Sequence, residues 1–378
     1  MQKLTLIFSD TEFGAGTATD DFVEDELLAK TIKKNVEYKN KYQIDLVFNG
    51  DTFDFAKCPH NGKYPRHITQ RISLDKLEAI HKAHPVFFKT LKESLSADSH
   101  LRIIFIHGNH DFDIEFPKVQ KRIIQLITGK TQHDRIIFAG FEFTDNLVHI
   151  EHGSQLDTYF RVDPKKLVYD SPNQIIGEPF LFTPWGYNAL YDHFIHIKAD
   201  YPLIERLHPR ARTIELLPFK LKKRVIFGTL FYLIKAFVYT QFRHWNDALY
   251  RFSVRDFRKY FTHFMRGEYD VKVDKNAKRK LKRNVFQVIC FGHTHRPRTQ
   301  KMKHKWFVNT GNWRDEYQLN EREKKYLPKP KTYAFIVHEP TKIHKVSLIE
   351  VPSRQRSWTI QEIKDLVRKP KERLLPTH

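Results

Sequence analysis

Five times along this 378-residue chain, a short apolar run gives way to a glycine-containing turn that carries aspartate, asparagine or histidine. The first three runs, Leu4–Phe8, Asp45–Asn49 and Leu101–His107, are dominated by apolar residues, as strands covered on both faces are. The carboxyl ends of parallel strands lie along one edge of a sheet, so polar residues that follow such strands can meet although they are distant in sequence. The repeated pattern therefore predicts an α/β fold with one composite site at a sheet edge.

Strand-like and helix-like segments alternate outside one long central stretch, which favours an α/β architecture. The predicted strands are Leu4–Phe8, Asp45–Asn49, Leu101–His107, Arg135–Ala139, Leu147–Glu151, Phe286–Phe291, Trp306–Asn309, Tyr333–Val337 and Val346–Glu350. The predicted helices are Asp21–Tyr42, Leu74–Leu95 and Pro117–Thr128. A capping-box pattern of Thr359 and Glu362 predicts one more short helix, ending near Arg368.

The stretch 160–282 interrupts this alternation and is predicted to be a mostly helical, basic and aromatic insertion, or cap, between two core strands. We therefore expect a core of residues 1–159 and 283–352, the cap at 160–282, and a C-terminal helix and tail at 353–378. Within the cap, Val225–Phe242 has a single charged residue, Lys235. This segment is interpreted either as a helix on a membrane interface or as a helix buried in the cap. A spanning helix is disfavoured, because the chain must return to the same core sheet.

The net charge of +21 is concentrated, since residues 215–305 contain 23 Lys and Arg against 6 Asp and Glu. Such a concentration indicates a polyanionic partner, either nucleic acid or an anionic membrane surface, and a solvated basic helix surface is the alternative. The two cysteines, Cys58 and Cys290, offer no disulfide framework, and the apolar start of the chain is too short for a signal peptide. We expect a cytoplasmic protein that is peripherally associated with membrane.

The polar residues at the strand ends are of the types that bind divalent metal ions. They are Asp10 and Glu12 after the first strand, Asp51 and Asp54 after the second, Asn109, His110 and Asp111 after the third, His152 after a later strand, and His293, His295 and Arg296 after the strand that follows the cap. Carboxylates, an amide oxygen and imidazoles suit two ions such as Mn²⁺, Fe²⁺, Zn²⁺ or Mg²⁺, with Mn²⁺ preferred. Two such ions can hold a phosphoryl group and generate a hydroxide nucleophile. The series predicts a two-metal site that hydrolyses phosphate.

The ordered blocks resemble the signature of the calcineurin-like metallophosphoesterase superfamily. They read Asp10-x-Glu12, Gly50-Asp51-x-x-Asp54, Gly108-Asn109-His110-Asp111, His152-Gly153 and Gly292-His293-Thr294-His295. The resemblance implies a four-layer α/β/β/α sandwich with the helical insertion as a cap. It also implies one metal held by Asp10, Asp51 and His295, and another held by Asp51, Asn109, His152 and His293, with Asp51 bridging.

The same resemblance assigns roles to the residues beside the metals. It implies that His110 protonates the leaving oxygen or contacts the phosphate, and that Asp111 supports its ring. Asn109 and Arg296 are expected at the substrate, with a rim position in water as the alternative for Arg296. Asp54 is expected to lie behind the metal ligands.

Glu12 is the one departure from this signature, because the superfamily has histidine at that place. Direct ligation by its carboxylate would make the first metal position favour Mn²⁺ or Mg²⁺ over Zn²⁺. Contact with the metal through water, and no role at the metal, are the alternatives.

A narrower similarity lies near the end of the signature. Gly292–Pro297 followed by Val308–Trp313, with a helical insertion ahead of them, resembles the UDP-2,3-diacylglucosamine pyrophosphatase branch. This resemblance implies hydrolysis of a phosphate ester or pyrophosphate in a lipid-linked or amphipathic substrate at a membrane surface. The alternatives are a phosphodiesterase or nuclease acting on nucleotides or nucleic acid, and an inactive metal-binding scaffold that recruits partners through its basic cap.

Overall fold

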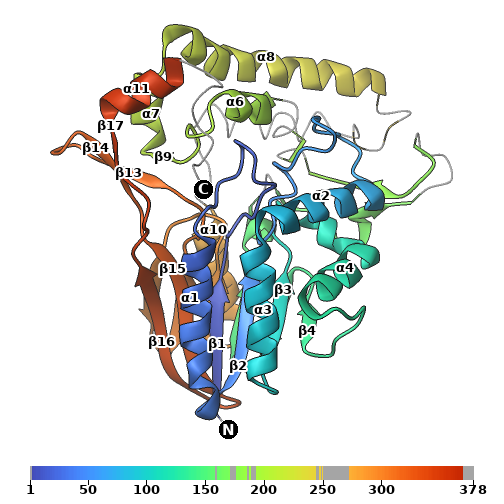
Figure 1. Ribbon diagram of the computed structural model, residues 1–378, viewed down its shortest axis with the longest axis vertical. Coiled ribbons are helices and arrows are strands. Elements are labelled where there is room, and N and C mark those ends of the chain that lie inside the picture. Colours follow the sequence, from blue (N-terminus) through green and yellow to red (C-terminus); the bar gives the residue numbers. More distant parts are fainter. Residues whose placement is uncertain are drawn as a thin grey trace.

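Two twisted sheets form the centre of the molecule in the computed structural model, which describes residues 2–157, 160–170, 176–184, 187–188, 193–243, 247, 249 and 272–368 (Figure 1). The larger sheet has the order β16-β15-β1-β2-β3-β4 and the smaller the order β11-β12-β10-β6-β5. The strands of the larger sheet are β1 Lys3–Phe8, β2 Gln43–Asn49, β3 Arg102–Ile106, β4 Ile136–Phe138, β15 Lys331–Glu339 and β16 Lys342–Val351. Those of the smaller are β5 Glu142–Asp145, β6 Val148–Glu151, β10 Val288–Phe291, β11 Arg298–Met302 and β12 Lys305–Asn309.

Both sheets bring the polar residues that follow their central strands to one end, because those strands are parallel. Strands β1 to β4 pair in parallel, as do β6, β10 and β12. The antiparallel strands flank them: β15 and β16 beside β1, β5 beside β6, and β11 beside β12. The nine predicted strands are all present, with bounds that differ by a few residues. The strands that sequence reasoning missed in these sheets, β5 and β11, are polar and partly exposed, so they lack an apolar run.

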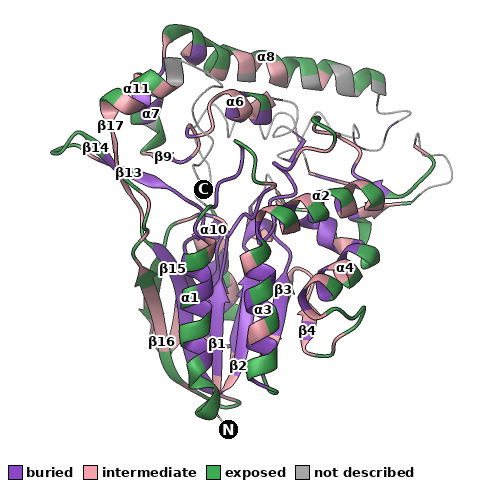
Figure 2. Ribbon diagram, viewed as in Figure 1, coloured by how far each residue is buried: buried purple, intermediate pink, exposed green. Residues whose placement is uncertain are grey.

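The two sheets pack face to face and are covered on their outer faces by helices, which gives the predicted four-layer α/β/β/α sandwich. Alternate residues of β1 enter different cores: Ile7 packs between the sheets, while Leu6 and Phe8 pack against the outer helices. On the far side, Ile289 and Phe291 of β10 pack against α10 Val273–Arg283. Figure 2 shows the buried strands in the middle of this arrangement and the exposed outer faces of α1 and α3.

The helices beside the larger sheet are α1 Asp25–Val36, α2 Gln70–Ala83, α3 Pro85–Ala97 and α4 Pro117–Thr128. The last has the bounds that the sequence predicts. The single helix predicted at Leu74–Leu95 is wrong, because the chain breaks at His84, which caps both α2 and α3. Pro85 occupies the first turn of α3, where its missing N–H and fixed φ are tolerated, and it cannot continue α2. A short 3-10 turn, Glu37–Asn40, follows α1 within the predicted Asp21–Tyr42.

Above the strand ends lies a region built from the insertion and the C-terminal segment. Its helices are α6 Ile195–Asp200, α7 Arg210–Leu216, α8 Phe219–Arg243 and α11 Ile360–Arg368. A small sheet of β17 Trp358–Thr359, β14 Lys325–Pro328, β13 Tyr317–Asn320 and β9 Leu207–His208 joins the insertion to the later chain. Two further short strands, β7 Val168–Tyr169 and β8 Phe180–Leu181, pair with each other.

Two features of this upper region were anticipated in the sequence. The segment Val225–Phe242 is helical within α8, which Figure 1 shows lying across the top of the molecule. Among the described residues, no helix has the length and apolar character needed to cross a membrane. The capping box is also present: the backbone N–H of Glu362 donates to Thr359 Oγ1 at 3.1 Å, and the backbone N–H of Thr359 donates to Glu362 Oε2 at 2.7 Å. Residues 369–378 of the tail lie outside the described residues.

Candidate metal centre

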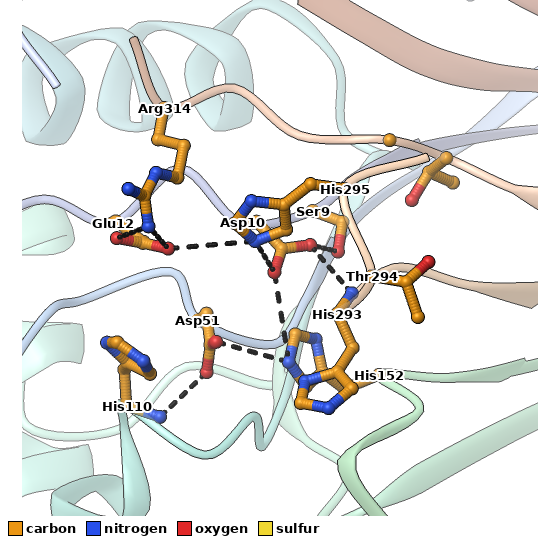
Figure 3. A network of polar contacts seen from close by, with 12 residues as sticks. Ser9, Asp10, Glu12, Asp51, His110, His152, His293, Thr294, His295 and Arg314 are labelled. Atoms are coloured by element: carbon orange, nitrogen blue, oxygen red, sulfur yellow. Dashed lines mark hydrogen bonds and ion pairs between the residues drawn. The ribbon is translucent and has the colours of Figure 1, made fainter. Parts of the chain in front are cut away.

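The five predicted loops meet at the carboxyl ends of β1, β2, β3, β6 and β10 (Figure 3). Backbone hydrogen bonds join the loops to one another before any side chain is considered. The N–H of Glu12 donates to the carbonyl of Asp51 at 2.8 Å, and the N–H of Gly292 donates to the carbonyl of His152 at 2.8 Å. The loops are therefore held in a fixed register, and their side chains project into a shared space.

One group of candidate ligands is formed by Asp51, His152 and His293, whose donor atoms lie within 4.8 Å of one another. His152 donates from Nδ1 to the carbonyl of Asn49 at 2.9 Å, because a carbonyl can only accept, and its Nε2 lies 3.2 Å from Asp51 Oδ2. The loop of His110 contacts Asp51 through a backbone N–H, and the side-chain oxygen of Asn109 on this loop is buried without a hydrogen-bond partner. A buried oxygen without a partner, on a loop that contacts one of these ligands, fits a divalent ion, which would satisfy it.

A second group is formed by Asp10, Glu12 and His295, again within 4.8 Å of one another. His295 Nε2 lies 3.1 Å from Asp10 Oδ1, and its Nδ1 lies 2.8 Å from Glu316 Oε1. A carboxylate behind an imidazole orients the ring and makes the other nitrogen a better ligand. Glu316 was not anticipated, because nothing in the sequence around β13 marks it as a partner of His295.

His110 stands at the side of the two groups. Its backbone N–H donates to Asp51 Oδ1 at 2.7 Å, and its ring Nδ1 lies 2.8 Å from Asp54 Oδ1. The ring is thus held by Asp54 and not by Asp111, which corrects the expected partner. Asp111 instead accepts from the backbone N–H groups of Gly108 at 2.6 Å and Thr52 at 2.8 Å, so it ties two of the site loops together.

Two glycines in the motifs are required by close approach. A Cβ on Gly108 would lie 2.0 Å from Asp51 Oδ1, and a Cβ on Gly292 would lie 1.9 Å from Ser9 Oγ and 2.4 Å from Asp10 Oδ2. No side chain fits at these distances. The glycines of the Gly-Asn-His-Asp and Gly-His-Thr-His blocks therefore let the loops approach closely enough for their ligands to meet.

Glu12 is engaged by two buried cations. Lys57 Nζ lies 2.5 Å from Glu12 Oε2, and Arg314 Nη1 donates to Glu12 Oε1 at 3.1 Å and to Oε2 at 3.2 Å. Burial alone would raise the pKa of Glu12, but Arg314 and Lys57 outweigh it and lower the pKa to about 2. Sequence reasoning missed both cations, because neither belongs to a recognisable motif.

The carboxylates also determine the charge of the histidines. Burial alone would lower the pKa of His152, but Asp51 and Asp10 outweigh it and raise the pKa to about 10. For His110 the charges of Asp51 and Asp54 do the same and raise the pKa to about 9. The pocket thus attracts positive charge strongly, and a metal ion would compete with protons for the same imidazole nitrogens.

Two further features complete the site and its surroundings. Arg296 is exposed at the rim, next to His295. A separate group of Glu142, His149 and Glu151 lies on β5 and β6, and Lys280 pairs with both of its carboxylates, at 2.8 and 3.1 Å. Lys280 already balances the negative charge of the two glutamates, so we do not count this group among the candidate metal positions.

Comparisons with known proteins add the following. No protein-family profile matches the sequence, and no curated protein matches it. Among solved structures, the chain is similar to a predicted phosphoesterase from Streptococcus pneumoniae, with 9% identity, a TM-score of 0.30, and coverage of 94% of this chain and 96% of the other. It is also similar to a Vps29 variant from Entamoeba histolytica, with 8% identity, a TM-score of 0.25, and coverage of 92% and 98%.

A third similar structure is the phosphopantetheinyl hydrolase from Mycobacterium tuberculosis, with 11% identity, a TM-score of 0.27, and coverage of 82% of this chain and 88% of the other. Such low identities and TM-scores identify no substrate.

Proposed function

We propose that this chain is a metal-dependent phosphoesterase that hydrolyses a phosphate ester or a pyrophosphate bond. The observation that carries the proposal is the meeting of Asp51, His152 and His293, from three different loops, and the buried, unpartnered oxygen of Asn109 on the loop that contacts Asp51 supports it. Together with Asp10 and His295 they offer two adjacent positions for divalent ions, and Mn²⁺ is the ion we propose, because their carboxylate and amide oxygens suit it. Ions bound there would stabilise charge on the phosphoryl oxygens and supply a nucleophile from water.

The chain itself contributes orientation and proton transfer. Asp54 engages Nδ1 of His110, which directs Nε2 of the same ring toward the substrate side, where it would donate a proton to the leaving oxygen. Asn109 would contact a phosphoryl oxygen as well as an ion, and Arg296 at the rim would add a positive charge for the phosphate. Asp111 would act through the backbone, by keeping the loops of Asp51 and His110 in register.

The test is hydrolysis of p-nitrophenyl phosphate and bis(p-nitrophenyl) phosphate by metal-stripped protein with and without added Mn²⁺. We expect activity that requires the metal and that falls at least about 100-fold in Asp51→Asn and in His293→Ala, since loss of a ligand costs no less than loss of its outer support. Asp134→Asn and His344→Ala, which alter surface residues of the same types, should retain activity. Full activity in the presence of EDTA would contradict the proposal.

A lipid-linked substrate, of the UDP-diacylglucosamine type, is the finer part of the proposal, and α8 supports it. The helix exposes Phe219, Ile226, Phe227, Phe231, Ile234, Val238 and Phe242. Phe227 and Phe231 are 61% and 68% exposed, one turn apart. An exposed apolar set of this size on a basic segment suits contact with an anionic membrane surface, where such a substrate would reside.

Co-sedimentation with vesicles of phosphatidylglycerol and phosphatidylcholine tests this part. We expect binding by the full chain, and a clear loss of binding in the double variant Phe227→Ser and Phe231→Ser. Val285→Ser is the matched control, because Val285 is an exposed apolar residue outside the helix, 91% exposed. Equal binding by the two variants would exclude α8 as the contact, and cleavage of nucleic acid that falls steeply with salt would favour a nuclease instead.

A further inference from the structure

The two candidate metal positions have different electrostatic surroundings. At the position of Asp51, the carboxylate is paired with the ring of His152 and with the backbone N–H of His110. At the position of Asp10 and His295, the third member of the group, Glu12, is paired with the permanent charges of Lys57 and Arg314. Of the carboxylates at the two positions, Glu12 is the one that is held by a lysine and an arginine. Asp10 instead contacts the hydroxyl of Ser9, the backbone N–H of His293 and the ring of His295.

Both oxygens of Glu12 are taken by these cations. Oε2 receives the ammonium of Lys57 at 2.5 Å, and Arg314 bridges both oxygens at 3.1 and 3.2 Å. All three side chains are buried, with 7% or less of each exposed. A two-pronged guanidinium and a buried ammonium on one carboxylate is a strong, charge-assisted arrangement, and it balances the negative charge that would attract a metal.

Other carboxylates hold the two cations in place, so they cannot easily swing away from Glu12. Lys57 also contacts Asp21 at 2.9 Å and Asp54 at 2.8 Å, and Arg314 also contacts Asp21 at 3.4 Å. Asp21 is itself fixed by Lys198 of α6 at 2.6 Å. Moving either cation would leave buried carboxylates unpaired, which costs several kcal/mol.

We propose that Glu12 anchors Lys57 and Arg314 rather than binding a metal, and that the centre therefore binds one divalent ion tightly and a second only weakly. The tight position is formed by Asp51, Asn109, His152 and His293. This inference rests on the proposed metal-dependent function and specifies how its site is loaded.

The physical basis is that two cations that stay charged already balance the negative charge of Glu12, so this carboxylate adds little attraction for a second divalent ion. Arginine does not lose its proton in proteins, and Lys57 is surrounded by three carboxylates. The interaction energy of two charges a few ångströms apart in a buried site is several times the thermal energy. We therefore expect the second ion to bind at least about 100-fold more weakly than the first.

The experiment is titration of the metal-stripped full-length chain with Mn²⁺, followed by isothermal calorimetry and by native mass spectrometry. One tightly bound ion, with a second that is at least about 100-fold weaker, is the expected result. Two ions of similar affinity would overturn the inference and leave the proposed function intact. No bound ion at millimolar Mn²⁺ would remove the metal site, and with it the proposed function.

Variants separate the role of the cations from that of the ligands. Lys57→Met is expected to strengthen binding of the second ion by about 10-fold or more, since it removes a positive charge and one of the two cations that contact Glu12 Oε2. Arg314→Gln is expected to act in the same direction, and it serves if Lys57→Met does not fold. Lys331→Met is the matched control: Lys331 is as buried as Lys57 and pairs with Asp315 and Glu24, away from Glu12. A folded Lys57→Met or Arg314→Gln protein with wild-type affinity for the second ion would contradict the inference.

Discussion

Gly108 offers the most direct test of the geometry of the candidate metal centre. A methyl group on this residue would lie 2.0 Å from Asp51 Oδ1 and 2.3 Å from the backbone nitrogen of Asp51. Ordinary contact begins near 3.4 Å, so the two loops would have to separate by more than about 1 Å. Asp51 cannot retreat alone, because its carbonyl accepts from Glu12 at 2.8 Å and its carboxylate accepts from the N–H of His110 at 2.7 Å.

The expected cost of Gly108→Ala has two parts. Overpacking of this kind destabilises a protein by about 1–3 kcal/mol, which lowers the melting temperature by several degrees in a chain of this size. Separation of Asp51 from His110 by about 1 Å is expected to reduce kcat/KM about 100-fold, because catalytic groups lose their alignment. Affinity for Mn²⁺ should fall as well, since Asp51 is one of the proposed ligands.

The assays are phosphodiester hydrolysis, Mn²⁺ titration and thermal unfolding of Gly108→Ala beside Gly129→Ala. Gly129 has a φ of +77° at the end of α4, and a Cβ there would meet nothing within 4 Å. Its substitution therefore carries only the backbone cost of about 1 kcal/mol and should leave activity unchanged. A Gly108→Ala protein with wild-type kcat/KM and wild-type Mn²⁺ affinity would refute the reasoning.

Three further predictions follow from single contacts. Burial would lower the pKa of His84, but hydrogen bonds to two aspartates raise the pKa to about 9. His84 therefore contributes stability below pH 6.5 that is lost as the pH rises toward 9. In urea unfolding of the wild type, the free energy of unfolding should decline by up to about 3 kcal/mol across this window, and His84→Gln should abolish the decline. Asp54→Asn should reduce kcat about 10- to 100-fold while Mn²⁺ affinity changes little, because it loosens the ring of His110. Thr359→Ala should lower the free energy of unfolding by about 1 kcal/mol and speed hydrogen exchange in α11 only, since it removes half of the capping box with Glu362. Unchanged hydrogen exchange in α11 would contradict this prediction.

The parts of the fold that could be predicted are those in which local sequence and burial agree. Strands such as β1 and β2 are buried on both faces, so their sequences are mostly apolar, and each is followed by a turn that contains aspartate. The meeting of Asp10 and Asp51 also follows from topology, because the parallel strands β1 and β2 deliver their ends to one edge. His295 follows β10 of the smaller sheet, so its approach to them also depends on the packing of the two sheets.

The parts that could not be predicted depend on pairings across the whole chain. Lys57 and Arg314 are separated by more than 250 positions, and only the tertiary structure brings them to Glu12. Strand β13 has the sequence Tyr-Gln-Leu-Asn and alternates between buried and exposed residues too briefly to be recognised. The helix break at His84 was detectable, since Pro85 cannot continue a helix, but the flanking apolar periodicity outweighed that signal.

The backbone conformation of the site residues argues that they serve chemistry rather than folding. Asp10, Glu12, Asp51, His293 and His295 have φ values between +49° and +63°, a left-handed conformation that costs a non-glycine residue about 1 kcal/mol or more. Glycine would relieve this cost at each position, so a sequence selected for stability alone would carry it there. The strain persists because neighbouring bonds fix the loops: the carbonyl of Asp10, for example, accepts from the backbone N–H groups of residues 313 and 314 at 3.0 and 2.9 Å. Five strained carboxylates and imidazoles, gathered where the strand ends of the two sheets meet, are thus best explained by a need for their side chains.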